Sequence, residues 1–176
     1  MSRTITRIAH EILEQHPGAG QLSVVGIHTR GAYLASRIHK LLCEVAGKQF
    51  ESGDIDISFY RDDVAARGAV GVIPTTPQPV VKDTHLPFVI DGATVILVDD
   101  VLYTGRTIRA AIDVLFDYGR PAAVQLAVLV DRGHRELPIR PDYVGKNLPT
   151  APRERISVRV DECDGVDEVV LVRKEA

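Results

Sequence analysis

The segment Val95-Ile-Leu-Val-Asp-Asp-Val-Leu-Tyr-Thr-Gly-Arg-Thr107 is the most informative stretch of this chain. Its first four residues, 95–98, predict a buried strand that leads into two adjacent carboxylates, Asp99 and Asp100. Residues 104–107 then turn the chain into a helix with an apolar stripe. Open α/β sheets bind their ligands at the carboxyl ends of the strands, so the sequence predicts a binding site at this point.

The two halves of this segment suit two parts of one ligand. Asp99 and Asp100 can accept hydrogen bonds from two vicinal ribose hydroxyls, whereas carboxylates repel a phosphate. Residues 104–107 present hydroxyls and backbone N–H groups at the start of a helix, which suits a phosphate. A ligand with a 5′-phosphate and a free 2′,3′-diol satisfies both halves. The alternative, an Asp-rich turn with a Thr/Gly helix cap, does not account for the combination.

Helical stripes and short apolar strands alternate on both sides of this segment. Helices are expected within residues 5–13, 34–45 and 108–116. Strands are expected at Leu22–Ile27 and at residues 55–60, 95–98, 123–130, 156–160 and 169–172, and an antiparallel pairing stays open for the last two. Uninterrupted apolar strands between helices are typical of a parallel sheet covered on both faces. We therefore expect one α/β domain over residues 1–176, with a doubly wound, mainly parallel sheet.

Composition narrows the class of protein. The chain has 176 residues, 45% of them apolar and 26% charged, which fits one globular domain and excludes a disordered or fibrous chain. No apolar run reaches the roughly 18 residues of a membrane span, so no membrane association is expected. Cys43 and Cys163 have no metal-binding spacing, which predicts free thiols in a reducing cytoplasm. Because the net charge is −3, binding of nucleic acid would need a local basic patch.

The central segment strongly resembles the signature with which type I phosphoribosyltransferases bind 5-phosphoribosyl 1-pyrophosphate (PRPP). The whole chain resembles the PyrR family, whose members are bifunctional regulators of pyrimidine operons and uracil phosphoribosyltransferases. The matching pieces, in the family's order, are residues 6–11, 25–31, 55–63, 95–107, 119–121, 125–140 and 142–150. The resemblance implies a type I phosphoribosyltransferase fold with a flexible flap at about residues 61–87. It also implies a small hood made of about residues 142–150 and the C-terminal strands.

The resemblance also implies where PRPP binds. The ribose and 5′-phosphate would contact Asp99, Asp100, Val101, Leu102, Tyr103, Thr104, Gly105, Arg106 and Thr107. The pyrophosphate loop would be Thr29, Arg30 and Gly31, although Arg30 taken alone could be an ordinary arginine at a helix start. Arg30 and Arg61 of the flap would stabilise the leaving pyrophosphate and, with Asp99 and Asp100, form the catalytic set. Mg²⁺ would enter with PRPP, because no His/Cys/Asp cluster predicts a protein cage for it.

The identity of the base is suggested by Tyr103. Purine-specific relatives carry an aspartate at this point of the signature, and a phenol with a pKa near 10 is a poor base at neutral pH. The resemblance therefore favours a pyrimidine, with uracil read by backbone groups of Val144, Lys146 and Asn147 in the hood. Asp131 would border the same crevice, or would form an ion pair at the end of its strand.

A second activity is implied by basic and polar residues outside the PRPP signature. The resemblance implies contacts with the leader of pyrimidine-gene mRNA, tightened by UMP or UTP, and a homodimer or higher assembly. The expected RNA contacts are Thr6, Arg7, His10, Arg135, Arg140 and Lys146. Three alternatives stay open: a plain salvage phosphoribosyltransferase, a nucleotide-sensing regulator with little turnover, and a basic rim that is merely solvated.

Overall fold

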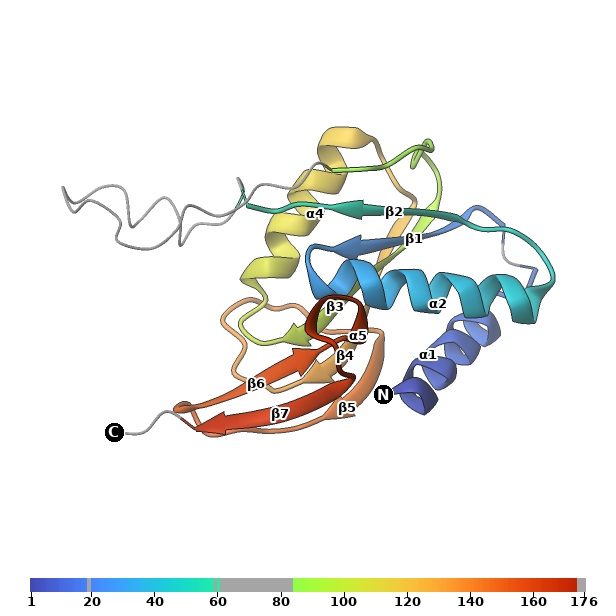
Figure 1. Ribbon diagram of the computed structural model, residues 1–176. Helices are drawn as coiled ribbons and strands as arrows, with labels where there is room; N and C mark the ends of the chain where they lie inside the picture. Colours follow the sequence, from blue (N-terminus) through green and yellow to red (C-terminus); the bar gives the residue numbers. More distant parts are fainter. Residues whose placement is uncertain (19, 59, 61–83, 174–176) are drawn as a thin grey trace.

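The computed structural model describes residues 1–18, 20–58, 60 and 84–173 (Figure 1). The helices are α1 (Ser2–Gln15), α2 (Arg30–Ala46), α4 (Arg106–Tyr118) and the short α5 (Asp161–Asp164). The strands are β1 (Leu22–Ile27), β2 (Glu51–Ile55), β3 (Thr94–Leu102), β4 (Ala123–Asp131), β5 (Tyr143–Asn147), β6 (Glu154–Arg159) and β7 (Glu168–Arg173). No helix in this described part of the chain is both long and apolar enough to cross a membrane.

The main sheet is parallel and doubly wound. Its five strands lie in the order β2-β1-β3-β4-β5, while β6 and β7 form a separate antiparallel pair. Helices α1 and α2 pack on one face of the main sheet and α4 packs on the other (Figure 1). Because the chain adds β2 on one side of β1 and β3 on the other, the topology reverses between β1 and β3. This confirms the predicted fold class and places a switch point, where such sheets bind ligands, at the end of β3.

Two hydrophobic cores explain why the central strands are apolar without interruption. Ile96 and Val98 of β3 pack beneath α1 and α2, whereas Val95 and Leu97 pack against α4. All four side chains are at most 1% exposed. A strand that is covered on both faces is apolar on both faces, so its sequence does not alternate between apolar and polar residues. Such a strand is recognised in the sequence as a short, continuous apolar run.

The helices follow their predicted stripes closely. Ile5, Ile8, Ala9 and Ile12 are the buried residues of α1, in agreement with the predicted spacing. Helix α2 ends at Gly47, which adopts a left-handed conformation with φ 65° and bonds back to the carbonyl of Cys43. Glycine is favoured at such a position because it has no Cβ to clash there.

One strand prediction is wrong and one strand was not predicted, and both concern the edges of the main sheet. The strand predicted at residues 55–60 is β2, and it ends at Ile55 rather than beginning there. The segment expected in the hood, residues 142–150, instead contributes β5, which pairs in parallel with β4. Edge strands have one neighbour and partly exposed faces, so β2 and β5 tolerate polar residues and glycines. Because of these residues, neither strand has the apolar pattern that predicts a strand.

The residues after β5 form a separate two-stranded sheet, β6 and β7, of which β6 contacts β3. Ile156, Val158 and Val160 join the core beneath α1 and α2, and β7 pairs with β6 on the outside. The expected strand at residues 156–160 is thus β6, shifted two residues towards the N-terminus. Residues 161–164, for which no element was expected, form α5 between the two antiparallel strands.

Two glycines allow α2 to begin very close to the sheet. A Cβ atom on Gly26 of β1 would lie 2.4 Å from the Cα of Ala32, and one on Gly31 would lie 2.6 Å from the carbonyl oxygen of Val98. Both obstacles are backbone atoms, which cannot rotate away. The N-terminus of α2 is therefore fixed directly above the ends of β1 and β3.

We expect Gly31→Ala to lower the free energy of unfolding by about 3 kcal/mol, since the added methyl group must push α2 away from β3. Gly20→Ala is the matched control, because a Cβ at Gly20 would meet nothing within 4 Å. Urea unfolding of both variants measures the difference. Equal midpoints for the two variants would show that the close approach is unimportant for stability.

Candidate functional site

The candidate site lies where β3 extends beyond the end of its neighbour β1. Pairing between β1 and β3 ends at Gly26 and Val98, but β3 continues beside β4 as far as Leu102. Asp99 and Asp100 therefore lie near the end of β3, in the part of this strand that is no longer paired with β1. Hydrogen-bonding groups at that edge are available to a ligand.

The two acids are held in place by the backbone. Asp99 is only 7% exposed, and its Oδ1 accepts the N–H of Asp100 at 2.9 Å. Oδ1 of Asp100 accepts the N–H of Val101 at 2.7 Å. Burial raises the pKa of Asp100 above its ordinary value, and the bond from Val101 and the charge of Arg30 oppose this only in part. Hydroxyl donors from a ligand would stabilise the charged form of this carboxylate.

A pocket of about 260 Å³ opens beside these acids. Its lining joins the loop after β1, through Thr29 and Arg30, to Asp99, Asp100 and Thr107 at the start of α4. The structure thus brings together parts that are separated by some 70 residues in the sequence. Gly31 lies directly beneath this junction, against Val98 and Asp99.

Two further polar residues of this pocket, Asp56 and Ser58, had no role predicted from the sequence. His28, Asp56 and Ser58 also line it, and Asp56 accepts hydrogen bonds from the N–H of Ser58 at 2.7 Å and from its hydroxyl at 2.5 Å. The ring of His28 contacts the carboxylate of Asp54 at 2.5 Å. A correct assignment of β2 would have revealed Asp56 and Ser58, because residues that follow β1 and β2 must meet at the same edge of a parallel sheet.

The turn after β3 has the geometry expected of a phosphate site. Gly105 is left-handed, with φ 94°, and caps α4, while the hydroxyl of Thr104 accepts the N–H of Arg106 at 3.3 Å. The N-terminus of a helix attracts anions through its N–H groups and its dipole. The side chain of Arg106 turns aside to pair with Glu136 at 2.6 Å, and Leu102 is buried in the core, so only their backbones remain for a ligand.

A second pocket, of about 190 Å³, lies on the other side of the acids. It shares Arg30, Asp100 and Val101 with the first pocket. Its remaining wall consists of Tyr103, Arg132 and residues 155–158 of β6. The two pockets therefore form one crevice that is divided at Asp100 and Val101.

Arg132 fastens the walls of the second pocket together. It is 6% exposed, and its guanidinium carbon lies 4.0 Å from the centre of the Tyr103 ring. Its Nε donates to the hydroxyl of Thr150 at 2.9 Å, and its Nη2 donates to the carbonyl of Glu154 at 2.6 Å. Both of these partners are uncharged groups, a hydroxyl and a backbone carbonyl.

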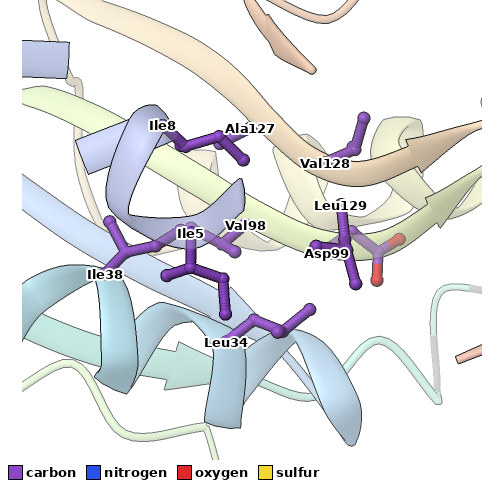
Figure 2. Close-up of a pocket in the computed structure, with 9 residues that line it drawn as sticks. All are labelled: Ile5, Ile8, Leu34, Ile38, Val98, Asp99, Ala127, Val128 and Leu129. Atoms are coloured by element: carbon purple, nitrogen blue, oxygen red, sulfur yellow. The ribbon is translucent and has the colours of Figure 1, made fainter. Parts of the chain in front are cut away.

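Behind Asp99 the protein is apolar. A void of about 10 Å³ lies between α1, α2 and the sheet, and Asp99 is the one polar residue among those that line it (Figure 2). Ile5 and Ile8 of α1 and Leu34 of α2 close it from the other side. A void this small, with apolar side chains on every side except that of Asp99, offers a water molecule too few hydrogen-bond partners. Asp99 can therefore gain hydrogen bonds only on the side of the crevice.

The residues predicted for the base lie outside both pockets. Val144, Lys146 and Asn147 are on β5, at the edge of the main sheet, whereas the second pocket is lined by β3, β6 and Arg132. Asp131 forms an ion pair at the end of its strand, as the alternative proposed, but its partner is Arg135, at 2.5 Å, rather than the neighbouring Arg132. Residues 143–147 form a strand of the main sheet, so the residues predicted to contact the base lie apart from the second pocket.

The residues predicted for RNA divide into two groups. Thr6, Arg7 and His10 lie on α1, which packs against β5, where Lys146 is exposed. Arg7 donates to the carbonyls of Val144 at 2.9 Å and Gly145 at 2.6 Å, so it ties α1 to β5.

Arg135 and Arg140 differ in their surroundings. The guanidinium of Arg135 donates to Asp131 and to the carbonyls of Tyr103 and Ile139, so all its nitrogens bond within the protein. We therefore expect Arg135 to act by shaping its loop rather than by direct contact. Arg140 is exposed.

Arg61, which completes the predicted catalytic set, lies outside the described residues, as does most of the predicted flap. Within the described ranges, no three His, Cys, Asp or Glu side chains are grouped so that they could hold a metal ion. The donor set of the crevice, two carboxylates beside an arginine, suits an ion that arrives already coordinated by a polyphosphate.

Comparison with known proteins identifies a family over nearly the whole chain. A family model described as "Phosphoribosyl transferase domain" matches residues 1–162. The "Bifunctional protein PyrR" of Listeria monocytogenes serotype 4a is 52% identical over 174 residues, covering 99% of this chain and 92% of the relative. The "Bifunctional protein PyrR" of Roseiflexus sp. is 57% identical over 175 residues, covering 99% and 91%.

Solved structures support the fold. The hypoxanthine phosphoribosyltransferase of Trypanosoma cruzi superposes with a TM-score of 0.68 at 19% identity, covering 99% of this chain and 92% of that chain. A hypoxanthine-guanine phosphoribosyltransferase of Bacillus anthracis gives a TM-score of 0.62 at 19% identity, covering 84% and 77%. At this identity the likeness concerns the fold alone.

The raised pKa of Asp100 makes a prediction about stability. The folded protein holds this proton more tightly than the unfolded chain, so ionisation of Asp100 costs stability as the pH rises above about 4. We expect Asp100→Asn to melt at or above the temperature of the parent at pH 7. The advantage should shrink as the pH falls to about 4 and below, where the carboxyl group of Asp100 becomes protonated in the folded protein and then in the unfolded chain.

Asp167→Asn provides the comparison of opposite sign, because the hydrogen bond from Arg37 lowers the pKa of Asp167. This variant should melt lower than the parent at pH 7, and its deficit should disappear as the pH falls. Thermal melts from pH 2 to pH 8 test both expectations, because the deficit of Asp167→Asn is lost only below about pH 4. A clear loss of stability in Asp100→Asn at pH 7 would contradict the role given to burial.

Proposed function

The chain belongs to the PyrR family of phosphoribosyltransferases, and we propose that it forms UMP and pyrophosphate from uracil and PRPP while also regulating pyrimidine genes through their mRNA leaders. One observation carries the enzymatic half: the two pockets meet at Asp100 and Val101, beside the ribose site. A transferase of this kind needs separate spaces for pyrophosphate and base on either side of C1 of the ribose. The crevice offers both.

The orientation of PRPP follows from the charges. The 5′-phosphate binds at residues 104–107 and the ribose hydroxyls donate to Asp99 and Asp100. Pyrophosphate occupies the pocket of Thr29 and Arg30, since a guanidinium and a helix N-terminus stabilise phosphate oxygens. The base then lies in the pocket of Tyr103 and Arg132. This order along the crevice leaves C1 between the nucleophile and the leaving group.

Catalysis rests on position and charge. N1 of uracil forms a bond to C1 as the bond from C1 to the pyrophosphate oxygen breaks, and the N1 proton is released. The transition state has oxocarbenium character at C1, which the buried carboxylates favour, while Arg30 and Arg61 stabilise the departing oxygen. Mg²⁺, carried in by PRPP oxygens and water, supplies further positive charge to the leaving group.

Backbone groups of β6 are suited to recognise uracil, in place of the β5 residues that the sequence suggested. Because Arg132 bonds the carbonyl of Glu154, that carbonyl faces the crevice rather than β7. Backbone direction alternates along an antiparallel strand, so N–H and C=O of Ile156 and Val158 face the same way. A strand edge offers an acceptor for N3–H and a donor for O4, which distinguishes uracil from cytosine.

Tyr103 supports a pyrimidine rather than a purine. Its hydroxyl is a weak base at neutral pH, and its ring is fixed against Arg132, so it provides a surface rather than a proton acceptor.

The pure protein is expected to form UMP from uracil and PRPP, with little reaction on orotate, cytosine, hypoxanthine or guanine. Asp99→Asn should lower kcat/KM for PRPP at least about 100-fold, because a ribose hydroxyl and the charge at C1 lose their partner. A product assay on all five bases measures both. Preference for a purine, or full activity in Asp99→Asn, would contradict the assignment.

The regulatory half is supported by the surface formed by α1 and β5. The apolar stripe of α1 faces the core, which leaves Thr6 and His10 outside that stripe, and α1 packs against β5, where Lys146 is exposed. RNA hairpins are bound mainly through phosphates, 2′-hydroxyls and unstacked bases, for which such side chains are suitable. UMP tightens RNA binding if the two ligands favour the same conformation or assembly. A homodimer or higher assembly and a cytoplasmic location are part of this proposal.

Arg140→Ala and Lys146→Ala should each weaken binding to the pyrimidine leader hairpin about three- to tenfold, and Arg140→Ala should retain UMP formation. Affinity should fall with salt by about 0.7 log units per log unit for each neutralised phosphate. Filter binding at two salt concentrations, with and without UMP, measures these effects. Arg109→Ala on α4, on the opposite face of the sheet from α1, is the control.

Equal affinity for the leader and a scrambled RNA, unchanged by UMP, would reject regulation and leave a salvage enzyme. RNA binding without UMP formation would instead indicate a nucleotide sensor.

A further inference from the structure

The guanidinium of Arg30 is held by a carboxylate from the C-terminal part of the chain. Asp164, the last residue of α5, accepts hydrogen bonds from Nε of Arg30 at 3.0 Å and from Nη2 at 2.8 Å. This is a two-point contact between planar groups, which fixes the direction as well as the position of the guanidinium. Asp164 also accepts the N–H of Val160 at 2.9 Å, so its own side chain is anchored.

The contact leaves one nitrogen of Arg30 for a ligand. Nε and Nη2 face Asp164, and Nη1 is the remaining corner of the fork. Arg30 lines both pockets of the crevice, and it lies close enough to Asp100 to influence its titration. A bound pyrophosphate oxygen can therefore meet Nη1 while Asp164 keeps the other two nitrogens in place.

An arginine needs such support at this position. Its side chain is 36% exposed, and a free arginine side chain loses rotational entropy when it is fixed. Asp164 stays ionised at working pH, because the hydrogen bond from Arg30 keeps the pKa of its carboxyl well below the usual range. Fixing the guanidinium in advance removes that cost from the transition state.

We propose that Asp164 is a positioning residue for phosphoribosyl transfer, which holds Arg30 so that Nη1 meets the leaving pyrophosphate. The inference rests on the proposed function, and it assigns the C-terminal helix α5 a part in the chemistry. A merely structural role for Asp164 would be limited to fastening α5 to α2.

The chain contains its own control for that structural role. About two helical turns further along α2, Arg37 binds Asp167 at 2.7 and 2.8 Å. Asp167 also accepts a backbone N–H, from Asp161 at 3.0 Å. Asp167 and Asp164 thus each bind one arginine of α2 and one backbone donor, but Arg37 lines neither pocket of the crevice.

The test compares Asp164→Asn with Asp167→Asn in the full chain. We expect Asp164→Asn to lower kcat about 10- to 100-fold, with the KM for uracil changed less than about twofold, as for the loss of a group that orients another. Asp167→Asn should keep kcat within about twofold. The melting temperature of Asp167→Asn should fall no further than that of Asp164→Asn, since Arg37 keeps Glu162 as a second carboxylate partner at 2.8 Å.

A double-mutant cycle and a binding measurement complete the test. In an Arg30→Ala background, Asp164→Asn should cause no further loss of kcat, because Asp164 acts through Arg30. Calorimetric titration with magnesium pyrophosphate should show about tenfold weaker binding to Asp164→Asn than to Asp167→Asn.

The outcomes separate the two claims. A parent protein that makes no UMP contradicts the proposed function, and the pyrophosphate titration then still decides the role of Asp164. Equal pyrophosphate affinity in the two variants, equal losses of kcat, or a loss that adds to that of Arg30→Ala would overturn the inference.

Discussion

The site depends on how closely α2 approaches the sheet. Gly26 and Gly31 remove the two Cβ atoms that would separate the first turn of this helix from β1 and β3. Without that approach, the loop carrying Thr29 and Arg30 would stand away from Asp99 and Asp100, and no single crevice would exist. The ligand site at the switch point is therefore a consequence of backbone packing, and the charged side chains are placed by it.

The same packing keeps the acids in an unfavourable environment that a ligand relieves. Asp99 has an apolar void behind it, and burial raises the pKa of Asp100. Buried carboxylates bind hydroxyl donors strongly, because they have few hydrogen bonds to water. Their burial lowers the stability of the protein without ligand. Helix α1 links this region to the surface proposed for RNA, since Ile5 and Ile8 close the void behind Asp99 (Figure 2) while Thr6 and His10 face outwards.

The sequence was sufficient for the interior of the molecule and for the PRPP signature. Continuous apolar strands and helical stripes are dictated by burial, so β1, β3, β4, α1, α2 and α4 were all predicted. Edge strands were not, because β2 and β5 are partly exposed and their residues are set by local pairing. With residues 142–150 placed in the hood, the base was expected beside β5, and the residues of β6 were given no contact with it. Contacts such as the one between Arg30 and Asp164 join residues 134 positions apart and have no local signal.

The most direct test of this account is a crystal structure of the protein with UMP bound. We expect the phosphate at residues 104–107, the ribose hydroxyls on Asp99 and Asp100, and the uracil ring between Tyr103 and β6, with Arg30 still held by Asp164. Uracil bound against Val144–Asn147, or a nucleotide whose ribose does not contact the two acids, would contradict the central claim that one crevice at the end of β3 holds both substrates.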